Sequence, residues 1–205
     1  MLRIDVSWLG SQFCVVPPPN MLKTTKQSDI LPDLIRDRIV VLDGAMGTMI
    51  QKLKLDEAAV RGNRFKSHHK ELAKFSDLLC ITRPDDITNI HYQYLKAGAD
   101  IVETNSFNAS RIGMIEFDLP IEYVRELNAA AVQCGRDAAD RVMREDPTRR
   151  CFVAGSIGPT AKQTAISTRV EDAAHRDVTF MEMVESYKGQ VAALVEAGAD
   201  LLIPE

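Results

Sequence analysis

Four short runs rich in apolar residues are spread along the chain, and longer segments of helical periodicity lie between them. These runs cover residues 39–42, 100–104, 151–155 and 200–203. In the first run, Ile39, Val40, Val41 and Leu42 follow one another without a polar residue. Such a run is typical of a strand buried on both faces of a parallel sheet. We therefore predict four strands.

The intervening segments carry apolar residues at the three- and four-residue spacing of amphipathic helices. We predict helices over residues 31–37, 82–97, 120–145 and 178–197. Thr82 and Asp85 form a capping-box pattern at the beginning of the second helix, and Gly98 is a residue type that commonly ends one. The alternation of helices and strands predicts an α/β fold with parallel strands.

One tetrapeptide, Ala-Gly-Ala-Asp, occurs at residues 97–100 and again at 197–200, each time between a predicted helix and a predicted strand. A repeated β/α architecture would use the same loop twice. The turn after the first strand, at residues 44–48, lacks the G-x-G-x-x-G spacing of a Rossmann sheet and the lysine of a P-loop. These two nucleotide-binding folds are thereby excluded.

Composition and charge restrict the partners. The formal net charge is −4 and the basic residues are scattered, so we predict no nucleic-acid partner. No apolar run approaches the length that spans a bilayer, and we predict no membrane partner. The cysteines Cys14, Cys80, Cys134 and Cys151 are widely spaced and form no CxxC pair. We expect them to be unpaired structural residues of a cytoplasmic protein.

The first 29 residues differ in character from the rest. Asp5 interrupts what would be the apolar region of a signal peptide, and Pro17 to Pro19 stand where a cleavage site would need small residues. We predict that residues 1–29 are a disordered or spurious extension, with Met21 as an alternative start. Residues 30–205 then form the domain.

Acidic residues stand at the ends of three predicted strands: Asp43, Glu103 and Glu205. Glu103 and Glu205 lie three and five residues after an aspartate that begins the strand, and both odd offsets place them on the same side. No lysine or arginine occupies a matching position. Burying several carboxylates together is costly without a cation, so a metal or a substrate ammonium is indicated. Ordinary turn chemistry explains the acids about as well.

Several stretches, taken together and in order, resemble one known family. They are VLDGAMGTMIQ at 41–51, RGNRF at 61–65, AGADIVETNSFN at 97–108, AGSIGPT at 154–160, and GAD from 198. These stretches are similar to the homocysteine-binding domain of cobalamin-dependent methionine synthases, and they extend over residues 30–205. The combination is specific, although each piece alone would be weak.

The resemblance implies a fold and an activity. The family domain is a (β/α)8 TIM barrel, of which about the first four β/α units would be present here, that is, its N-terminal half. A complete barrel has about 250 residues. The implied activity is methyl transfer to the homocysteine thiolate, which yields methionine. We expect the isolated chain to be unstable, oligomeric or aggregation-prone, and inactive, because a partial barrel leaves open edges.

The resemblance also implies how homocysteine is held. Its ammonium would lie between Asp43 and Glu205, and its carboxylate would accept hydrogen bonds from backbone N–H groups of the loop after the first strand. That loop contains Gly44, Ala45 and Met46. Four further residues match motif positions at the same rim and are expected to support the site: Glu103, Thr104, Asn105 and Ser156.

The family uses zinc to bind the substrate sulfur, with cysteine ligands on later strands of the barrel, beyond Glu205. None of the four cysteines here occupies a matching position, so we expect no catalytic or metal-binding residue within this chain. Cobalamin and methyltetrahydrofolate are implied only by the resemblance, through other modules of the enzyme. The expected partners are those modules or a separate C-terminal half.

Three alternatives remain open. The chain could be part of a betaine- or S-methylmethionine-dependent homocysteine methyltransferase, although residues 61–65 favour the cobalamin-dependent type. It could be a non-enzymatic half-barrel remnant that binds an amino acid or a protein partner. It could also be an unrelated metal protein that uses histidines, for which the candidates are His68, His69, His91 and His175. Surface or structural roles are favoured for these histidines.

Overall fold

A computed structural model describes residues 30–164, 171–172 and 174–205. Within them, three parallel strands form a sheet in the order β1-β2-β3. The strands are β1 (Ile101–Glu103), β2 (Phe152–Ile157) and β3 (Leu201–Pro204). They confirm three of the four predicted strands and the parallel α/β arrangement. The closed eight-stranded barrel stays a prediction.

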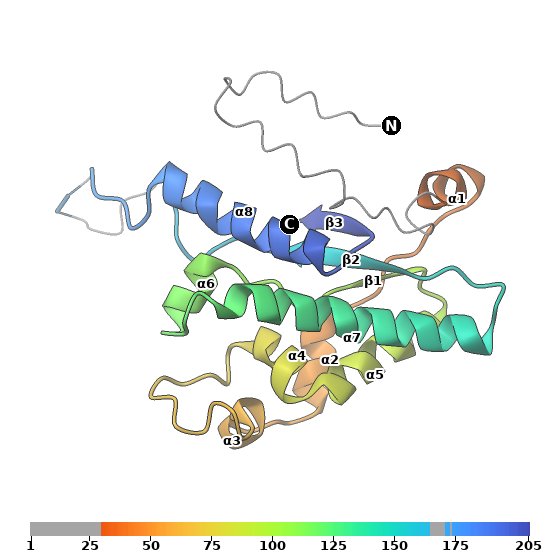
Figure 1. The fold of residues 1–205 in the computed structure, drawn as a ribbon, viewed down its shortest axis with the longest axis horizontal. Coiled ribbons are helices and arrows are strands. Elements are labelled where there is room, and N and C mark those ends of the chain that lie inside the picture. Colours follow the sequence, from red (N-terminus) through yellow and green to blue (C-terminus); the bar gives the residue numbers. More distant parts are fainter. Residues whose placement is uncertain (1–29, 165–170, 173) are drawn as a thin grey trace.

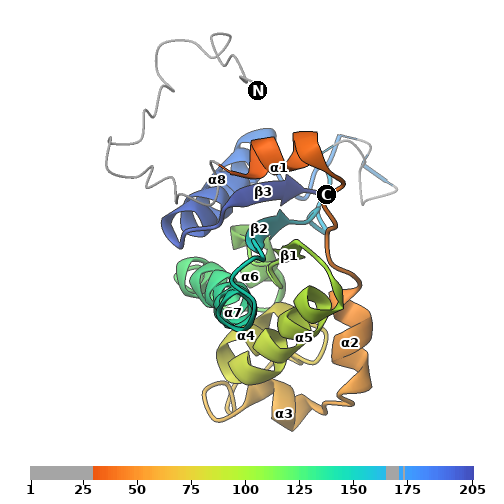
Figure 2. The same cartoon turned by 90° about the vertical axis from the view of Figure 1, so that its right-hand side faces the viewer.

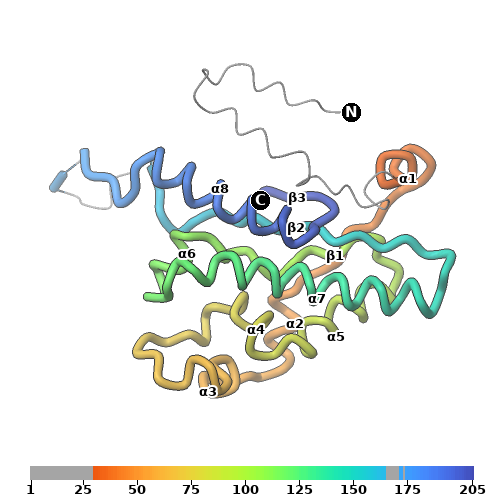
Figure 3. Tube along the Cα trace, in the orientation of Figure 1, coloured from red at the N-terminus to blue at the C-terminus, as the bar shows by residue number. Residues whose placement is uncertain are grey.

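The predicted strand at residues 39–42 is replaced by a single parallel bridge between Leu42 and Ile101. This segment runs beside β1, on the path from α1 to α2 (Figure 3). It has a strand neighbour on one side only among the described residues. Ile39, Val41 and Leu42 are 86%, 49% and 40% exposed, so the prediction that this segment is buried on both faces is wrong.

Most of the helices lie along one face of this small sheet or below β1 (Figure 1). Their bounds are α1 (Leu31–Asp37), α2 (Met46–Lys52), α3 (Glu57–Arg61), the 3-10 helix η1 (Ser76–Leu78), α4 (Leu79–Thr82), α5 (Pro84–Ala97), α6 (Arg111–Glu116), α7 (Tyr123–Glu145) and α8 (Phe180–Glu196). The four predicted helices correspond to α1, α5, α7 and α8. The others, which have seven residues or fewer, were not predicted.

The ends of the helices confirm the predicted C-terminal glycine and contradict the predicted capping box. Gly98 and Gly198 adopt positive φ values of 117° and 89° just after α5 and α8, as expected for glycine at a helix C-terminus. The capping box predicted at Thr82 is wrong, because Thr82 is the last residue of α4 and its hydroxyl donates to the carbonyl of Leu78. The structure has a capping box at α8, formed by Thr179 and Glu182.

The two Ala-Gly-Ala-Asp repeats have the same structural role. Asp100 accepts a hydrogen bond from the N–H of Val41 at 3.0 Å, and Asp200 accepts one from the N–H of Val153 at 2.9 Å. Each aspartate also binds an arginine: Arg38 at 2.7 Å and Arg136 at 2.8 Å, respectively. Each repeat thus ties a strand to its neighbour at the strand's amino end.

Side chains alternate strictly between the two faces of the sheet. On one face, Val102, Val153 and Leu202 belong to an apolar cluster with residues of α5, α7 and α8. Figure 2 shows α7 and α8 together on one side of the strands. On the other face, Phe152 and Ala154 form a smaller cluster with residues of α1 and β3. Glu103, Ser156 and Glu205 continue the second face by parity, as the sequence predicted for the two acids.

Cys80, Cys134 and Cys151 are buried and unpaired, which confirms the prediction for three of the four cysteines. Cys14 lies outside the described residues, as does the whole predicted extension at 1–29. No helix in the described part of the chain has the length and hydropathy to cross a membrane.

A glycine-to-alanine pair tests the packing of α6. A Cβ atom at Gly113 would lie 1.9 Å from the carbonyl oxygen of Asn108, whereas a Cβ at Gly189 in α8 would meet nothing within 4 Å. We expect Gly113→Ala to lower the free energy of unfolding by about 1–3 kcal/mol. Gly189→Ala should raise it by roughly 0.5–1 kcal/mol, because alanine is the better helix former. Urea unfolding measures both, and equal effects would contradict the close contact.

Candidate functional site

A cavity of about 490 Å³ lies at the carboxyl ends of the strands and beside the loop before α2. Each of the nine residues predicted from the sequence lines it: Asp43, Gly44, Ala45, Met46, Glu103, Thr104, Asn105, Ser156 and Glu205. Four more lining residues were not predicted: Gly47, Ser76, Phe107 and Asn108. Phe107 and Asn108 belong to the motif at 97–108. Ser76 comes from a segment that carries no motif.

Asp43 is held against β1 by both its backbone and its side chain. Its N–H donates to the carbonyl of Ile101 at 2.9 Å, and its Oδ2 accepts from the N–H of Glu103 at 3.2 Å. The side chain is only 3% exposed. The short parallel pairing of residues 41–43 with β1 is therefore sufficient to place the Asp43 carboxylate at the carboxyl end of that strand.

Glu205 is positioned by β2. Its N–H donates to the carbonyl of Ile157 at 3.0 Å, and its Oε1 accepts from the hydroxyl of Ser156 at 2.8 Å. The backbone N–H of Ser156 in turn donates to the hydroxyl of Thr104 at 2.9 Å. These bonds join the ends of the three strands into one polar network.

Asn105 and the buried hydroxyl of Ser106 extend this network. Asn105 donates from Nδ2 to the carbonyl of Ser76 at 2.8 Å, which explains how a distant segment reaches the pocket. The Ser106 hydroxyl donates to the carbonyl of Ser156 at 2.9 Å and lies 2.7 Å from the Thr104 hydroxyl. The Asn105 amide and the hydroxyls of Thr104 and Ser106 are thus paired within the protein.

The loop before α2 has room only for a small residue at position 44. A Cβ on Gly44 would lie 2.7 Å from the ring of Tyr94 in α5. The Tyr94 hydroxyl donates to the carbonyl of Ala45 at 3.3 Å, which fixes the loop from below. Met46 begins α2, and the first N–H groups of a helix have no acceptor inside it.

The carboxyl ends of the strands form the rim of the cavity, and the rim carries three acidic residues: Asp43, Glu103 and Glu205. Burial, followed by the proximity of Glu205 and Asp43, raises the pKa of Glu103 to about 7. Its Oε1 is buried without a hydrogen-bond partner among the described residues. No lysine or arginine lines the cavity in the part of the chain that the structure describes. The site is therefore chemically suited to a ligand that brings a positive charge.

A zinc site of the thiolate-binding kind does not fit these residues. Within the described ranges, no group of three or more His, Cys, Asp or Glu side chains could hold a metal ion. His68 bonds the carbonyl of Phe117 at 2.9 Å, and His69 and His175 contact aspartates at 3.3 Å and 3.1 Å. These three histidines are engaged in structural contacts.

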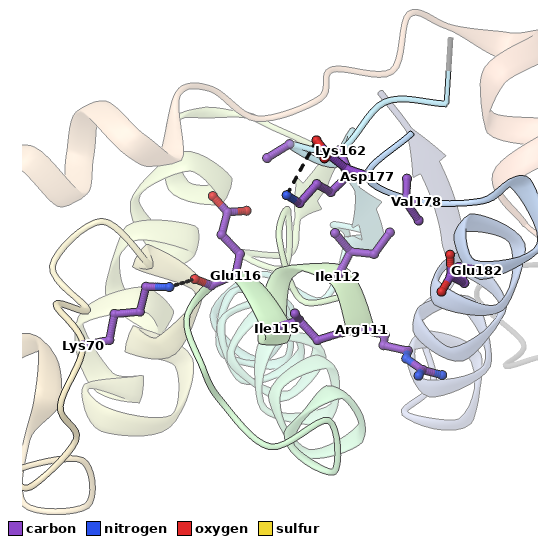
Figure 4. Close-up of a pocket in the computed structure, with 10 residues that line it drawn as sticks. Lys70, Arg111, Ile112, Ile115, Glu116, Lys162, Asp177, Val178 and Glu182 are labelled. Carbon is purple, nitrogen blue, oxygen red and sulfur yellow. Dashed lines mark hydrogen bonds and ion pairs between the residues drawn. The ribbon is translucent and has the colours of Figure 1, made fainter. Parts of the chain in front are cut away.

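A second cavity, of about 420 Å³, lies near α6 and the beginning of α8 (Figure 4). None of the nine predicted site residues lines it. Two of its charged side chains have partners within the protein: Lys162 lies 3.9 Å from Asp177, and Lys70 donates to the carbonyl of Glu116. Its remaining lining includes the apolar side chains of Ile112 and Ile115. This cavity does not concentrate charge of one sign.

The model of the family described as homocysteine S-methyltransferase matches residues 40–205 of the chain. The chain belongs to the homocysteine S-methyltransferase family. Membership confirms, at the level of the family, the resemblance found in the sequence. The cobalamin-dependent type remains a finer prediction.

Solved structures agree with the family. The chain is similar to the homocysteine methyltransferase MmuM from Escherichia coli in its metallated form, with a TM-score of 0.65 and 25% identity over 85% of this chain and 56% of that one. For the oxidized form the TM-score is 0.63 at 25% identity, over 84% and 55%. For the apo form it is 0.57 at 25% identity, over 84% and 51%. The chain thus spans a little over half the length of MmuM.

We expect Glu103→Gln to flatten the dependence of stability on pH. The raised pKa means that the folded protein keeps a proton on Glu103 that the unfolded chain releases at lower pH. The stabilising contribution of this proton is complete below pH 4.5 and is lost as the pH rises to about 7. The variant cannot ionise at this position. Between about pH 5 and about pH 8, the unfolding temperature should fall further for wild type than for Glu103→Gln.

The matched control is Glu71→Gln, which removes a charge at an exposed position. Its unfolding temperature should follow that of wild type at both pH values. Parallel behaviour of wild type and Glu103→Gln would show that the Glu103 carboxyl is not kept protonated by its surroundings.

Proposed function

We propose that the cavity at the strand ends binds homocysteine and presents its sulfur for methylation to methionine. The observation that carries the proposal is the meeting of Asp43, Glu103 and Glu205 at one cavity whose described lining contains no basic side chain. The family of the chain supports homocysteine as the substrate. The nine residues predicted from the sequence are proposed as the substrate site.

The substrate ammonium is proposed to lie between Asp43 and Glu205. Like charges near one another in a partly buried place are unfavourable, and a bound cation removes much of that cost. Ser156 orients the Glu205 carboxylate by its 2.8 Å hydrogen bond. When the ammonium arrives, the Glu103 carboxyl is favoured in its ionised form and contributes a further negative charge.

The substrate carboxylate is proposed to accept hydrogen bonds from the loop of Gly44, Ala45 and Met46. Backbone N–H groups in such a loop suit an anion, and the small side chains at positions 44 and 45 let the ligand approach closely. The amino and carboxylate groups of the substrate, which share one carbon atom, would then be recognised by neighbouring groups of the cavity, and its thiol would point away from both.

Activation of the thiol is proposed to involve zinc carried by residues other than those described. One structure of MmuM is of a metallated form, which supports a metal in the family. We place cobalamin and methyltetrahydrofolate on other modules as well. The described residues would hold and orient the amino acid part of the substrate and take no part in transferring the methyl group.

The open edges of the sheet support a partner that completes it. Ile39 and Val41, in the segment that pairs only with β1 among the described residues, are 86% and 49% exposed, and β3 is only partly buried along its length. Exposed apolar residues at a sheet edge favour pairing with further strands. We propose a C-terminal half of the barrel as that partner, and an isolated chain that is inactive without it.

A second candidate is a non-enzymatic half-barrel that only binds an amino acid. The absence of a three-ligand metal group among the described residues favours it. Calorimetry with homocysteine, with and without zinc, distinguishes the candidates. An affinity for homocysteine that does not depend on zinc supports an amino-acid site. Binding that requires zinc would show a metal site in this chain.

Removing either rim charge should weaken homocysteine binding. We expect Asp43→Asn and Glu205→Gln to lower the affinity by about tenfold to a hundredfold each, because hydrogen bonds between charged groups contribute about 1.5–3 kcal/mol. Titration calorimetry measures the dissociation constants. Glu185→Gln, which removes an exposed charge from α8, is the control and should bind as wild type does. Unchanged affinity in both rim variants would refute the proposed ammonium site.

Binding should also weaken in acid. As the pH falls from about 7 to about 5, Glu103 gains a proton and the rim loses a negative charge, which disfavours the ammonium by up to about tenfold per pH unit. In Glu103→Gln the affinity should be lower at neutral pH and nearly constant over the same range. A wild-type affinity that does not change with pH would argue against a role for Glu103.

A further inference from the structure

His91 of α5 is a fully buried polar side chain: its exposed fraction is 0%. Neither of its ring nitrogens has a hydrogen-bond partner within the described chain. Buried polar groups are rarely left unpaired, because each costs about 1–3 kcal/mol. The sequence pattern had favoured a surface or structural role for His91. Neither role explains a buried ring without a partner.

The ring points toward the proposed substrate site. Its Nδ1 lies 3.9 Å from Oδ2 of Asp43, whose side chain is itself 3% exposed. This separation is too long for a hydrogen bond and short enough to become one after a small movement. Around His91, α5 packs against α2, α4, α7 and β1, and Asp43 is the charged group in contact with the ring.

Asp43 has little support from other donors. Its Oδ2 accepts a hydrogen bond from the neutral backbone N–H of Glu103, at 3.2 Å. The neighbouring Glu103 carboxyl repels it when ionised. A buried carboxylate needs more than one donor to be held in a single orientation as an anion. His91 Nδ1 is the side-chain donor placed to supply the second bond.

We propose that His91 is a positioning residue for the recognition of the substrate amine. It donates from Nδ1 to Oδ2 of Asp43 when the ligand ammonium draws that carboxylate into its binding orientation, and so fixes the remaining oxygen toward the cavity. This inference rests on the proposed homocysteine site. It adds a residue outside the cavity lining, which acts only through Asp43.

The test compares two ligands: homocysteine, and 4-sulfanylbutanoate, which has the same thiol and carboxylate and no amine. We expect His91→Leu to lower the affinity for homocysteine by about tenfold and to leave that for 4-sulfanylbutanoate unchanged. His91→Asn should recover most of the loss, because the asparagine amide nitrogen can occupy the place of Nδ1. A purely structural role would weaken both ligands equally, and that result would overturn the inference.

A double-variant cycle shows whether His91 acts through Asp43. In an Asp43→Asn background, His91→Leu should have no further effect on homocysteine affinity, because the group that it positions is already changed. The full tenfold loss in that background would also overturn the inference. Circular dichroism of each variant confirms that it is folded.

A measurement without ligand keeps the inference separate from the proposed function. If wild type does not prefer homocysteine to 4-sulfanylbutanoate, the ammonium site itself is wrong. Nitrogen NMR of the His91 ring still tests its contact with Asp43. The proton should reside on Nδ1 in wild type, and the signal should change in Asp43→Asn but not in Glu205→Gln, the matched charge removal. An unchanged signal in Asp43→Asn would contradict the assigned contact.

Discussion

Two aspartates determine how neighbouring strands are aligned, and the rest of the structure depends on that alignment. Asp100 binds the N–H of Val41, and Asp200 binds the N–H of Val153. Each carboxylate is held by an arginine, so it accepts charge-assisted bonds in a fixed direction. A shift of one residue would turn every following side chain to the opposite face. The aspartates therefore determine, from the amino end, which residues meet at the carboxyl end.

This alignment concentrates unfavourable interactions where the cavity lies. Asp43 stands beside Glu103, and Ser156 stands beside Glu205. Apolar packing on both faces stabilises the sheet beneath them. The protein can therefore keep a cluster of like charges at its rim without losing its fold. Such a cluster is prepared for a cation before any ligand arrives, which reduces the reorganisation needed on binding.

Much of this arrangement could be predicted from the sequence. The runs at 100–104, 151–155 and 200–203 became strands because helices cover one of their faces and the neighbouring strands pair with them. The run at 39–42 has the same composition, but in the described chain only β1 pairs with it, and a propensity for strand is not sufficient without neighbours. Thr82 matched a capping pattern, yet it completes the turn of α4, which periodicity cannot reveal.

The acidic residues that line the cavity were easier to predict from the sequence than Ser76 and His91. Strand parity and the motif placed the acids on one face, and the structure brings them to one cavity. Ser76 and His91 gave no such signal. Ser76 reaches the cavity through a tertiary hydrogen bond with Asn105. His91 occurs on an amphipathic helix, where a single histidine looks like any other polar position. Only the folded structure shows that Asp43 lies next to His91.

The close contact at Gly44 has a consequence for the motion of α5. His91 and Tyr94 are three residues apart and so lie on the same face of this helix. One approaches Asp43, and the other bonds the carbonyl of Ala45 while its ring leaves no space for a side chain on Gly44. A rigid helix cannot move one of these side chains without moving the other. A displacement along α5 would reach Asp43 and the loop of Gly44 and Ala45 at once, so this helix is mechanically coupled to two neighbouring parts of the cavity wall.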